Sequence, residues 1–149
     1  MERDGDYAIS QKCYNRRKNN MSKTKEDLIA FRLGKAAECL ELARFSISKG
    51  YWNAAAGELY YTCFYYVLAL FAKHDISSST HTGVNTLFGL HFIKEGKIDA
   101  KWGRLVKVLF DKRQKGDYGD FMILTEQEVM PFLNEVAEFE KVIQHLMRD

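Results

Sequence analysis

Apolar residues recur along this chain at intervals of three and four positions, the spacing that places them on one face of an α-helix. The first such segment runs from about residue 25 to residue 49, and Gly50 follows it as a typical helix stop. The second runs from Trp52 to Lys73 and carries an apolar stripe along its whole length. Small residues at 54–57 allow the backbone of a neighbouring helix to approach closely. The pattern therefore predicts two long helices separated at Gly50.

Polar and glycine-containing segments divide the rest of the chain into three further helices. The loop over 74–82 contains a run of hydroxyl side chains, which cap helix N-termini more readily than they form strands. Thr125 and Glu128 have the spacing of a capping box, in which each side chain accepts a hydrogen bond from the backbone N–H of the other residue. The predicted helices cover about 83–94, about 100–116 with interruptions at Gly116 and Gly119, and the segment from Thr125 to about Met147.

The expected fold is all-α, a bundle of four to five helices, because no segment alternates with the period of a strand over a useful length. The first 24 residues differ from the rest: they are polar, include the basic run 16–20 and have no helical period. We assign residues 1–24 as an N-terminal extension and residues 25–149 as the helical domain. Two interpretations of the extension stay open: a basic arm that contacts nucleic acid, and a segment without an ordered role.

Composition narrows the class of protein only modestly. A chain of 149 residues is one domain by default, and a net charge of +2 does not by itself indicate a nucleic-acid partner. The three cysteines lack paired spacing and are typical of reduced thiols in a cytoplasmic protein. The chain has no apolar run of about 18 residues and no hydrophobic signal core, so we expect no membrane association. It also lacks metal-site spacing and a phosphate-binding glycine loop, so no metal and no cofactor are expected.

The segment from Leu109 to Phe121 concentrates side chains that can perform chemistry. The segment is predicted to form the C-terminal part of an amphipathic helix. Its cationic side chains are followed by Asp117 and Tyr118. Arg113 near a helix C-terminus interacts favourably with the helix dipole, and Asp117 can close an ion pair with it. A structural ion pair, a phosphate site and a catalytic site are therefore all compatible with this segment.

Three short strings give the chain a resemblance to a known family. They are the small residues 54–56 followed by Leu-Tyr-Tyr at 59–61, His-Thr-Gly-Val at 81–84, and Arg-Gln-Lys-Gly-Asp-Tyr at 113–118. In this order and spacing they resemble the HEPN domain family, and the resemblance covers roughly residues 25–147. It implies a bundle of four or five helices that forms a dimer around its second and fourth helices. Many members of that family are RNA-cutting toxins.

Ribonuclease members of the family carry an arginine followed, about four to six residues later, by a histidine. Cleavage through the 2′-hydroxyl of RNA needs a proton-transfer group active near neutral pH and a cation for the charge that builds on phosphate. Histidine and arginine suit these two roles. Arg113 matches the arginine, but Tyr118, Gly119 and Asp120 stand where the histidine is expected, and no histidine occurs between His91 and His145.

The candidate catalytic residues are consequently Arg113, Asp117 and Tyr118, and the candidate RNA-binding cations are Arg104, Lys107, Lys112 and Lys115. The resemblance implies a HEPN-type protein of a prokaryotic toxin–antitoxin or defence system. Such a protein would be a homodimer that binds RNA in a dimer cleft, cleaves it as a metal-independent endoribonuclease, and pairs with a minimal nucleotidyltransferase. The alternative is a non-catalytic dimerising or adaptor module. The missing histidine leaves both open.

The remaining aromatic and imidazole side chains are expected to be mainly structural. His81 is interpreted as a helix cap or packing residue rather than a ligand. The run Tyr60, Tyr61, Tyr65 and Tyr66 is too rich for a single buried stripe. We expect two of these tyrosines in the core, and the other two at a dimer interface or, alternatively, in a base-stacking platform.

Overall fold

The computed structural model describes residues 23–149, so both interpretations of the N-terminal extension lie outside the described residues. The described part consists of five α-helices and one π-helical turn, which confirms the all-α fold. In chain order these are α2 (Lys25–Ser48), α3 (Trp52–Lys73), α4 (His81–Phe88), the π-helical turn η1 (Gly89–Ile93), α5 (Ala100–Tyr118) and α6 (Glu126–Arg148).

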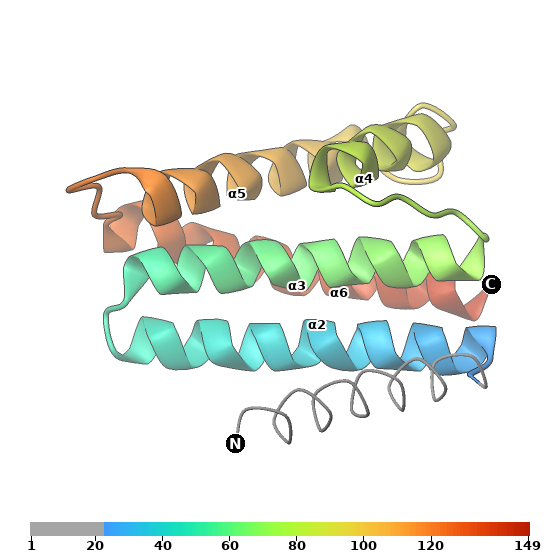
Figure 1. Cartoon of the computed structure of the whole chain (residues 1–149), viewed down its shortest axis with the longest axis horizontal. Helices are drawn as coiled ribbons and strands as arrows, with labels where there is room; N and C mark the ends of the chain where they lie inside the picture. Colours follow the sequence, from blue (N-terminus) through green and yellow to red (C-terminus); the bar gives the residue numbers. More distant parts are fainter. Residues whose placement is uncertain (1–22) are drawn as a thin grey trace, which may run out of the picture.

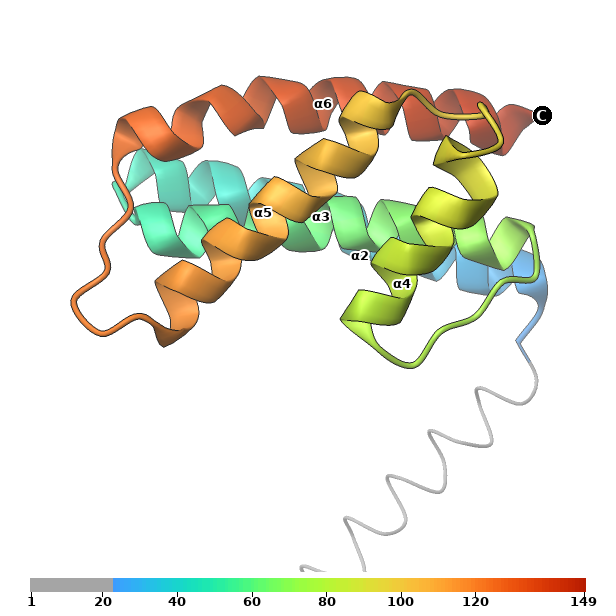
Figure 2. The same cartoon turned by 90° about the horizontal axis from the view of Figure 1, so that it is seen from above.

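The helices pack in three layers around α3. Helices α3 and α6 form the middle layer, α2 covers one side of it, and α4 and α5 cover the other (Figure 1). Helix α5 crosses α3 obliquely rather than running along it (Figure 2). As a result the C-terminal half of α5 and the N-terminus of α4 both approach α3, although the two segments are far apart in the sequence.

Local sequence signals set the ends of the long helices. Thr24 and Asp27 form a capping box at the start of α2, and Thr125 and Glu128 form the predicted box at the start of α6. Helix α2 ends where predicted, because Gly50 adopts a left-handed φ of +71° that favours glycine. The second helix has the predicted bounds.

Two helix ends differ from the sequence-based expectation. The third helix begins at His81 rather than residue 83, because the Thr80 hydroxyl accepts a hydrogen bond from the Gly83 backbone and so caps an earlier turn. The fourth helix continues through Gly116 to Tyr118 instead of ending at Gly116. A single glycine costs a helix only about 1 kcal/mol, which tertiary contacts readily offset.

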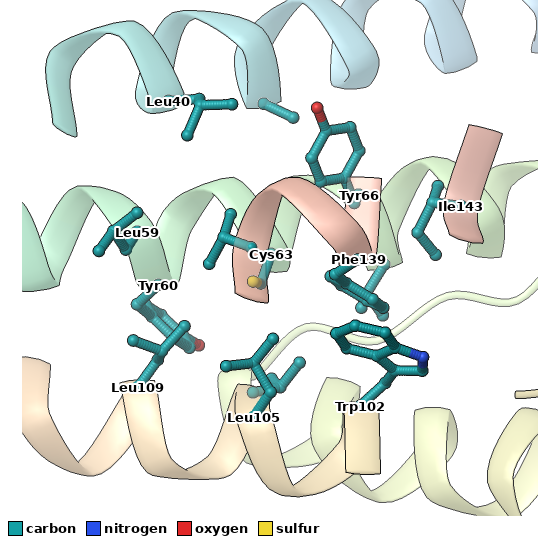
Figure 3. Close-up of a cluster of buried hydrophobic side chains, with 14 of the residues drawn as sticks. Leu40, Leu59, Tyr60, Cys63, Tyr66, Trp102, Leu105, Leu109, Phe139 and Ile143 are labelled. Carbon is teal, nitrogen blue, oxygen red and sulfur yellow. The ribbon is translucent and has the colours of Figure 1, made fainter. Parts of the chain in front are cut away.

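The core lies between the layers and combines aliphatic side chains with aromatic rings (Figure 3). Phe139 of α6 stacks on Trp102 of α5 at 5.5 Å between centroids and meets Tyr66 of α3 edge-on at 6.5 Å. Tyr60 and Tyr66 are buried whereas Tyr61 and Tyr65 are only partly buried, so the core takes two of the four tyrosines, as predicted.

Two of the cysteines are buried free thiols, in agreement with the sequence-based interpretation, while Cys13 lies outside the described residues. Burial, reinforced by the nearby Glu58, raises the pKa of the Cys39 thiol to about 12, which keeps it protonated and unreactive. Within residues 23–149, every helix is too short or too polar to span a bilayer.

Candidate functional site

Arg113 lies against the aromatic face of α3. Its guanidinium carbon is 4.9 Å from the centre of the Tyr61 ring and 5.7 Å from that of Tyr60. These distances are within the range of a cation–π interaction, which is stronger where water is excluded. Gly57 of α3 faces the stem of Arg113, and a Cβ added there would lie 3.9 Å from Arg113 Cγ, an ordinary van der Waals contact. The arginine is therefore seated on two tyrosine rings rather than projecting freely into solvent.

Asp117, one turn further along α5, forms an ion pair with Arg113. Arg113 Nε lies 3.2 Å from Asp117 Oδ2, and the two side chains are 15% and 45% exposed. The ion pair is among the alternatives predicted from the sequence, but the arginine is more buried than its place near a helix end suggests. The angle at Nε is unfavourable for a hydrogen bond, so among the described residues this N–H has no hydrogen-bond acceptor. Because this Nε atom is buried, an added anion cannot reach it, and only the terminal nitrogens of the guanidinium could serve as donors to one.

His81 enters the same cluster from the N-terminus of α4. Its Nδ1 is 2.7 Å from the Tyr60 hydroxyl, and its ring stacks on Phe64 at 4.4 Å between centroids. The packing role predicted for His81 is confirmed, whereas the cap of α4 is Thr80. We call Arg113, Asp117, Tyr60, Tyr61, Phe64 and His81 together the Arg113 cluster.

The surroundings of His81 favour its neutral form. Partial burial, assisted by the positive charge of Arg113, lowers the pKa of His81 below its ordinary value of about 6.5. Burial raises the pKa of Tyr60, so its hydroxyl stays protonated at neutral pH. If Tyr60 donates to Nδ1, the proton of His81 is on Nε2; in the other tautomer Nε2 is free to accept a proton. Either way, a neutral imidazole lies beside an arginine.

The structure brings together only some of the residues predicted from the sequence. Arg113 and Asp117 are adjacent, while Tyr118 is 75% exposed at the end of α5. Lys112 lies on the other side of α5, with its ammonium 5.6 Å from the centre of the Phe132 ring of α6. Lys112 therefore does not add its charge to the Arg113 cluster.

The other three predicted cations lie on the exposed face of α5. Arg104 and Lys107 line a groove of about 470 Å³ between α4 and α5. Lys107 also approaches Asp111 at 3.7 Å, which offsets part of its charge. Lys115 is exposed near the C-terminus of the helix. These side chains form a dispersed basic surface and not a compact anion site.

Asn53 is a site residue that the sequence did not reveal. Its side chain donates to the Met122 carbonyl at 2.9 Å and accepts from the Leu124 backbone N–H at 2.8 Å. These bonds attach the α5–α6 loop to the start of α3. The loop carries Phe121, which is fully exposed and has a left-handed φ of +62°. Asn53 therefore fixes the segment that follows the Arg113–Asp117 pair.

Replacing Asn53 with alanine is expected to loosen this loop. The change removes an exposed and a partly buried hydrogen bond to the loop backbone, and each typically contributes about 0.5–1.5 kcal/mol. Hydrogen exchange should become faster at Leu124, and unfolding in urea should occur at a lower concentration. Asn134→Ala, at an exposed position of α6, is the matched control. Equal exchange at Leu124 in both variants would contradict the role assigned to Asn53.

Comparison with known proteins identifies the family to which the chain belongs. The chain is 31% identical over 125 residues to a UPF0332 protein of Thermotoga maritima, covering 84% of this chain and 95% of that protein. It is 28% identical over 114 residues to a protein of Methanocaldococcus jannaschii named "Putative toxin", covering 76% of this chain and 84% of that protein. The family model described as the HEPN domain matches residues 29–146. The chain belongs to the HEPN domain family.

Proposed function

We propose that this chain is a toxin-type HEPN protein that binds RNA at the Arg113 cluster and cleaves it without a metal ion. The observation that carries the proposal is the cation–π contact of Arg113 with two tyrosine rings, next to the neutral His81. Two relatives from Methanocaldococcus jannaschii are named "Putative toxin", at 28% and 27% identity, which supports a toxin-type role.

RNA binding follows from the chemistry of the cluster. The guanidinium of Arg113 suits a phosphate, because its planar fork of donors matches two phosphate oxygens. The half-buried ring of Tyr61 contacts the guanidinium and can stack on a nucleobase. Arg104 and Lys107 on the same helix would add sequence-independent attraction for the backbone.

Cleavage would use His81 in place of the histidine that the sequence motif lacks. In the proposed reaction the 2′-oxygen loses its proton to His81 and attacks phosphorus, while the bond from phosphorus to the 5′-oxygen breaks. The products are a 2′,3′-cyclic phosphate and a 5′-hydroxyl, and the leaving oxygen takes up a proton from solvent water. Arg113 would stabilise the negative charge on the phosphate oxygens during this step. Asp117 would orient the guanidinium through its ion pair.

We further propose a homodimer through α3 and α5 and pairing with a minimal nucleotidyltransferase. Phe64 and Tyr65 form a partly buried aromatic surface on α3, and Val108 is 40% exposed on α5. Burying these groups across a two-fold axis would remove an exposed apolar surface and bring two Arg113 clusters towards one cleft. The nucleotidyltransferase rests on the family resemblance, and a short reading frame for such an enzyme beside this gene would support it.

A non-catalytic HEPN module is the second candidate. The ion pair with Asp117 and the low exposure of Arg113 favour it, because a neutralised and partly buried arginine also serves to stabilise the fold. This candidate predicts that substitutions of Arg113 reduce stability without changing the affinity for RNA.

Replacing Arg113 tests these two functions against each other. Arg113→Ala is expected to weaken binding of a mixed-sequence single-stranded RNA by roughly tenfold to a hundredfold, because a hydrogen bond to a charged group contributes about 1.5–3 kcal/mol. Arg113→Lys should restore binding only in part, since the fork of donors is lost. Fluorescence anisotropy at several salt concentrations should also show a shallower salt dependence for Arg113→Ala, because fewer counterions are released.

Arg44→Ala, at an exposed position of α2, is the matched control and should retain RNA affinity. Circular dichroism should show that Arg113→Ala stays folded. We expect a loss of about 1–2 kcal/mol, because a cation–π contact and a packed stem disappear. Unchanged RNA affinity together with this loss of stability would reject the RNA-binding proposal in favour of the non-catalytic module.

A further inference from the structure

Helix α2 carries an apolar stripe on a face turned away from the core. The stripe contains Leu28, Phe31, Leu42 and Phe45, which are 40%, 61%, 43% and 56% exposed. Lys35 and Glu38 occupy its centre, where they approach each other at 3.9 Å. We call these six residues the α2 stripe. Their alternating separations of three and four positions are those of a coiled-coil seam, whereas Ala36, Leu40 and Ala43 point into the core.

The α2 stripe is self-complementary when read in the two directions along the helix. About the midpoint between Ala36 and Ala37, Leu28 corresponds to Phe45 and Phe31 corresponds to Leu42. The same reversal makes Lys35 correspond to Glu38. Every apolar position therefore has an apolar counterpart, and the basic position has an acidic one.

We propose that the α2 stripe binds the same stripe of a second copy of this chain, with the two helices antiparallel about a two-fold axis. In this arrangement the Lys35 ammonium of each copy faces the Glu38 carboxylate of the other, and the four charges form an alternating network at the axis. A parallel arrangement would instead place lysine opposite lysine and glutamate opposite glutamate, which is unfavourable. The match of both apolar and charged positions favours a second copy over an unrelated partner.

The position of α2 makes this surface separate from the Arg113 cluster. Helix α2 packs on α3 on the side of the middle layer opposite α4 and α5 (Figure 1). The inference therefore does not rest on the proposed function. With a two-fold contact through α3 and α5 as well, the α2 contact would join two dimers.

Charge reversal at the centre of the stripe gives a direct test on the full chain. Lys35→Glu and Glu38→Lys each place like charges across the axis, so each is expected to halve the mass measured by sedimentation. The double variant Lys35→Glu with Glu38→Lys restores opposite charges across the axis and is expected to restore the mass. Phe31→Glu is expected to halve the mass and to have no such rescue. Lys141→Glu, exposed on α6, is the matched control and should keep the parent mass.

Two results would overturn the proposal. One is a parent chain and charge variants that all sediment with the same mass at micromolar concentration. The other is a Phe31→Glu variant that melts at a lower temperature but keeps the parent mass, because the stripe would then be covered by another part of the same chain.

Discussion

Replacing His81 with phenylalanine is expected to reduce RNA cleavage by the full chain by about 100-fold to 10,000-fold, the range that a positioned proton-transfer group contributes. Phenylalanine keeps the ring that stacks on Phe64 at 4.4 Å but has no nitrogen to exchange a proton or to meet the Tyr60 hydroxyl. RNA affinity should change little, because Arg113 keeps its contacts with Tyr60 and Tyr61. Single-turnover cleavage of a labelled RNA in the presence of a chelator measures the effect.

The pH dependence of cleavage provides a second readout of His81. Burial and the charge of Arg113 lower its pKa, so the neutral form that acts as a base should already dominate at pH 7. The rate should fall as the pH drops through this lowered pKa, below the ordinary histidine value of about 6.5. The free energy of unfolding should also decrease as the pH falls. The contribution of neutral His81 is fully present above the unfolded pKa and is lost as the pH falls through the folded one.

His145→Phe, at an exposed position of α6, is the matched control and should cleave at the parent rate. Cleavage that survives His81→Phe but disappears on Asp117→Asn or Tyr118→Phe would assign proton transfer to those residues. A parent chain that binds RNA without cleaving it would instead support a non-catalytic module.

Replacing Phe139 with alanine is expected to reduce the free energy of unfolding by about 3–5 kcal/mol, the usual cost of deleting a fully buried aromatic ring. Phe139 is 0% exposed and contacts rings from three other helices: Tyr66 of α3, Phe88 of α4 and Trp102 of α5. These contacts join the middle layer to the α4–α5 layer (Figure 3). Loss of the ring leaves a cavity that the surrounding helices can only partly fill.

Phe121→Ala is the matched control, because this phenylalanine is fully exposed in the α5–α6 loop and buries no ring. Urea unfolding followed by circular dichroism should give nearly the parent midpoint for Phe121→Ala and a much lower midpoint for Phe139→Ala. Similar midpoints for the two variants would mean that Phe139 does not connect the helical layers as the structure indicates.

Local sequence signals were sufficient to predict the number and order of the described helices, but not all of their ends. A capping box such as Thr125 with Glu128, and a glycine stop such as Gly50, act within a few residues of each other. The prediction of the second helix from Trp52 to Lys73 rests on the helical spacing of its apolar residues, which is also a short-range signal, and it is confirmed. The fourth helix was predicted too short, because Gly116 weakens a helix locally while packing across the bundle sustains it.

Only part of the candidate site could be predicted from the sequence, because some of its contacts join residues far apart along the chain. The pairing of Arg113 with Asp117 lies within one turn of one helix, so its spacing is visible in the sequence. The meeting of His81 with Tyr60, and that of Asn53 with the α5–α6 loop, join residues far apart along the chain. Those contacts depend on the oblique crossing of α5 over α3 and on the position of the α4 N-terminus (Figure 2). The sequence by itself determined which described segments are helical and that Arg113 and Asp117 have the spacing of an ion pair, whereas only tertiary packing decided that this pair lies against two tyrosine rings beside His81.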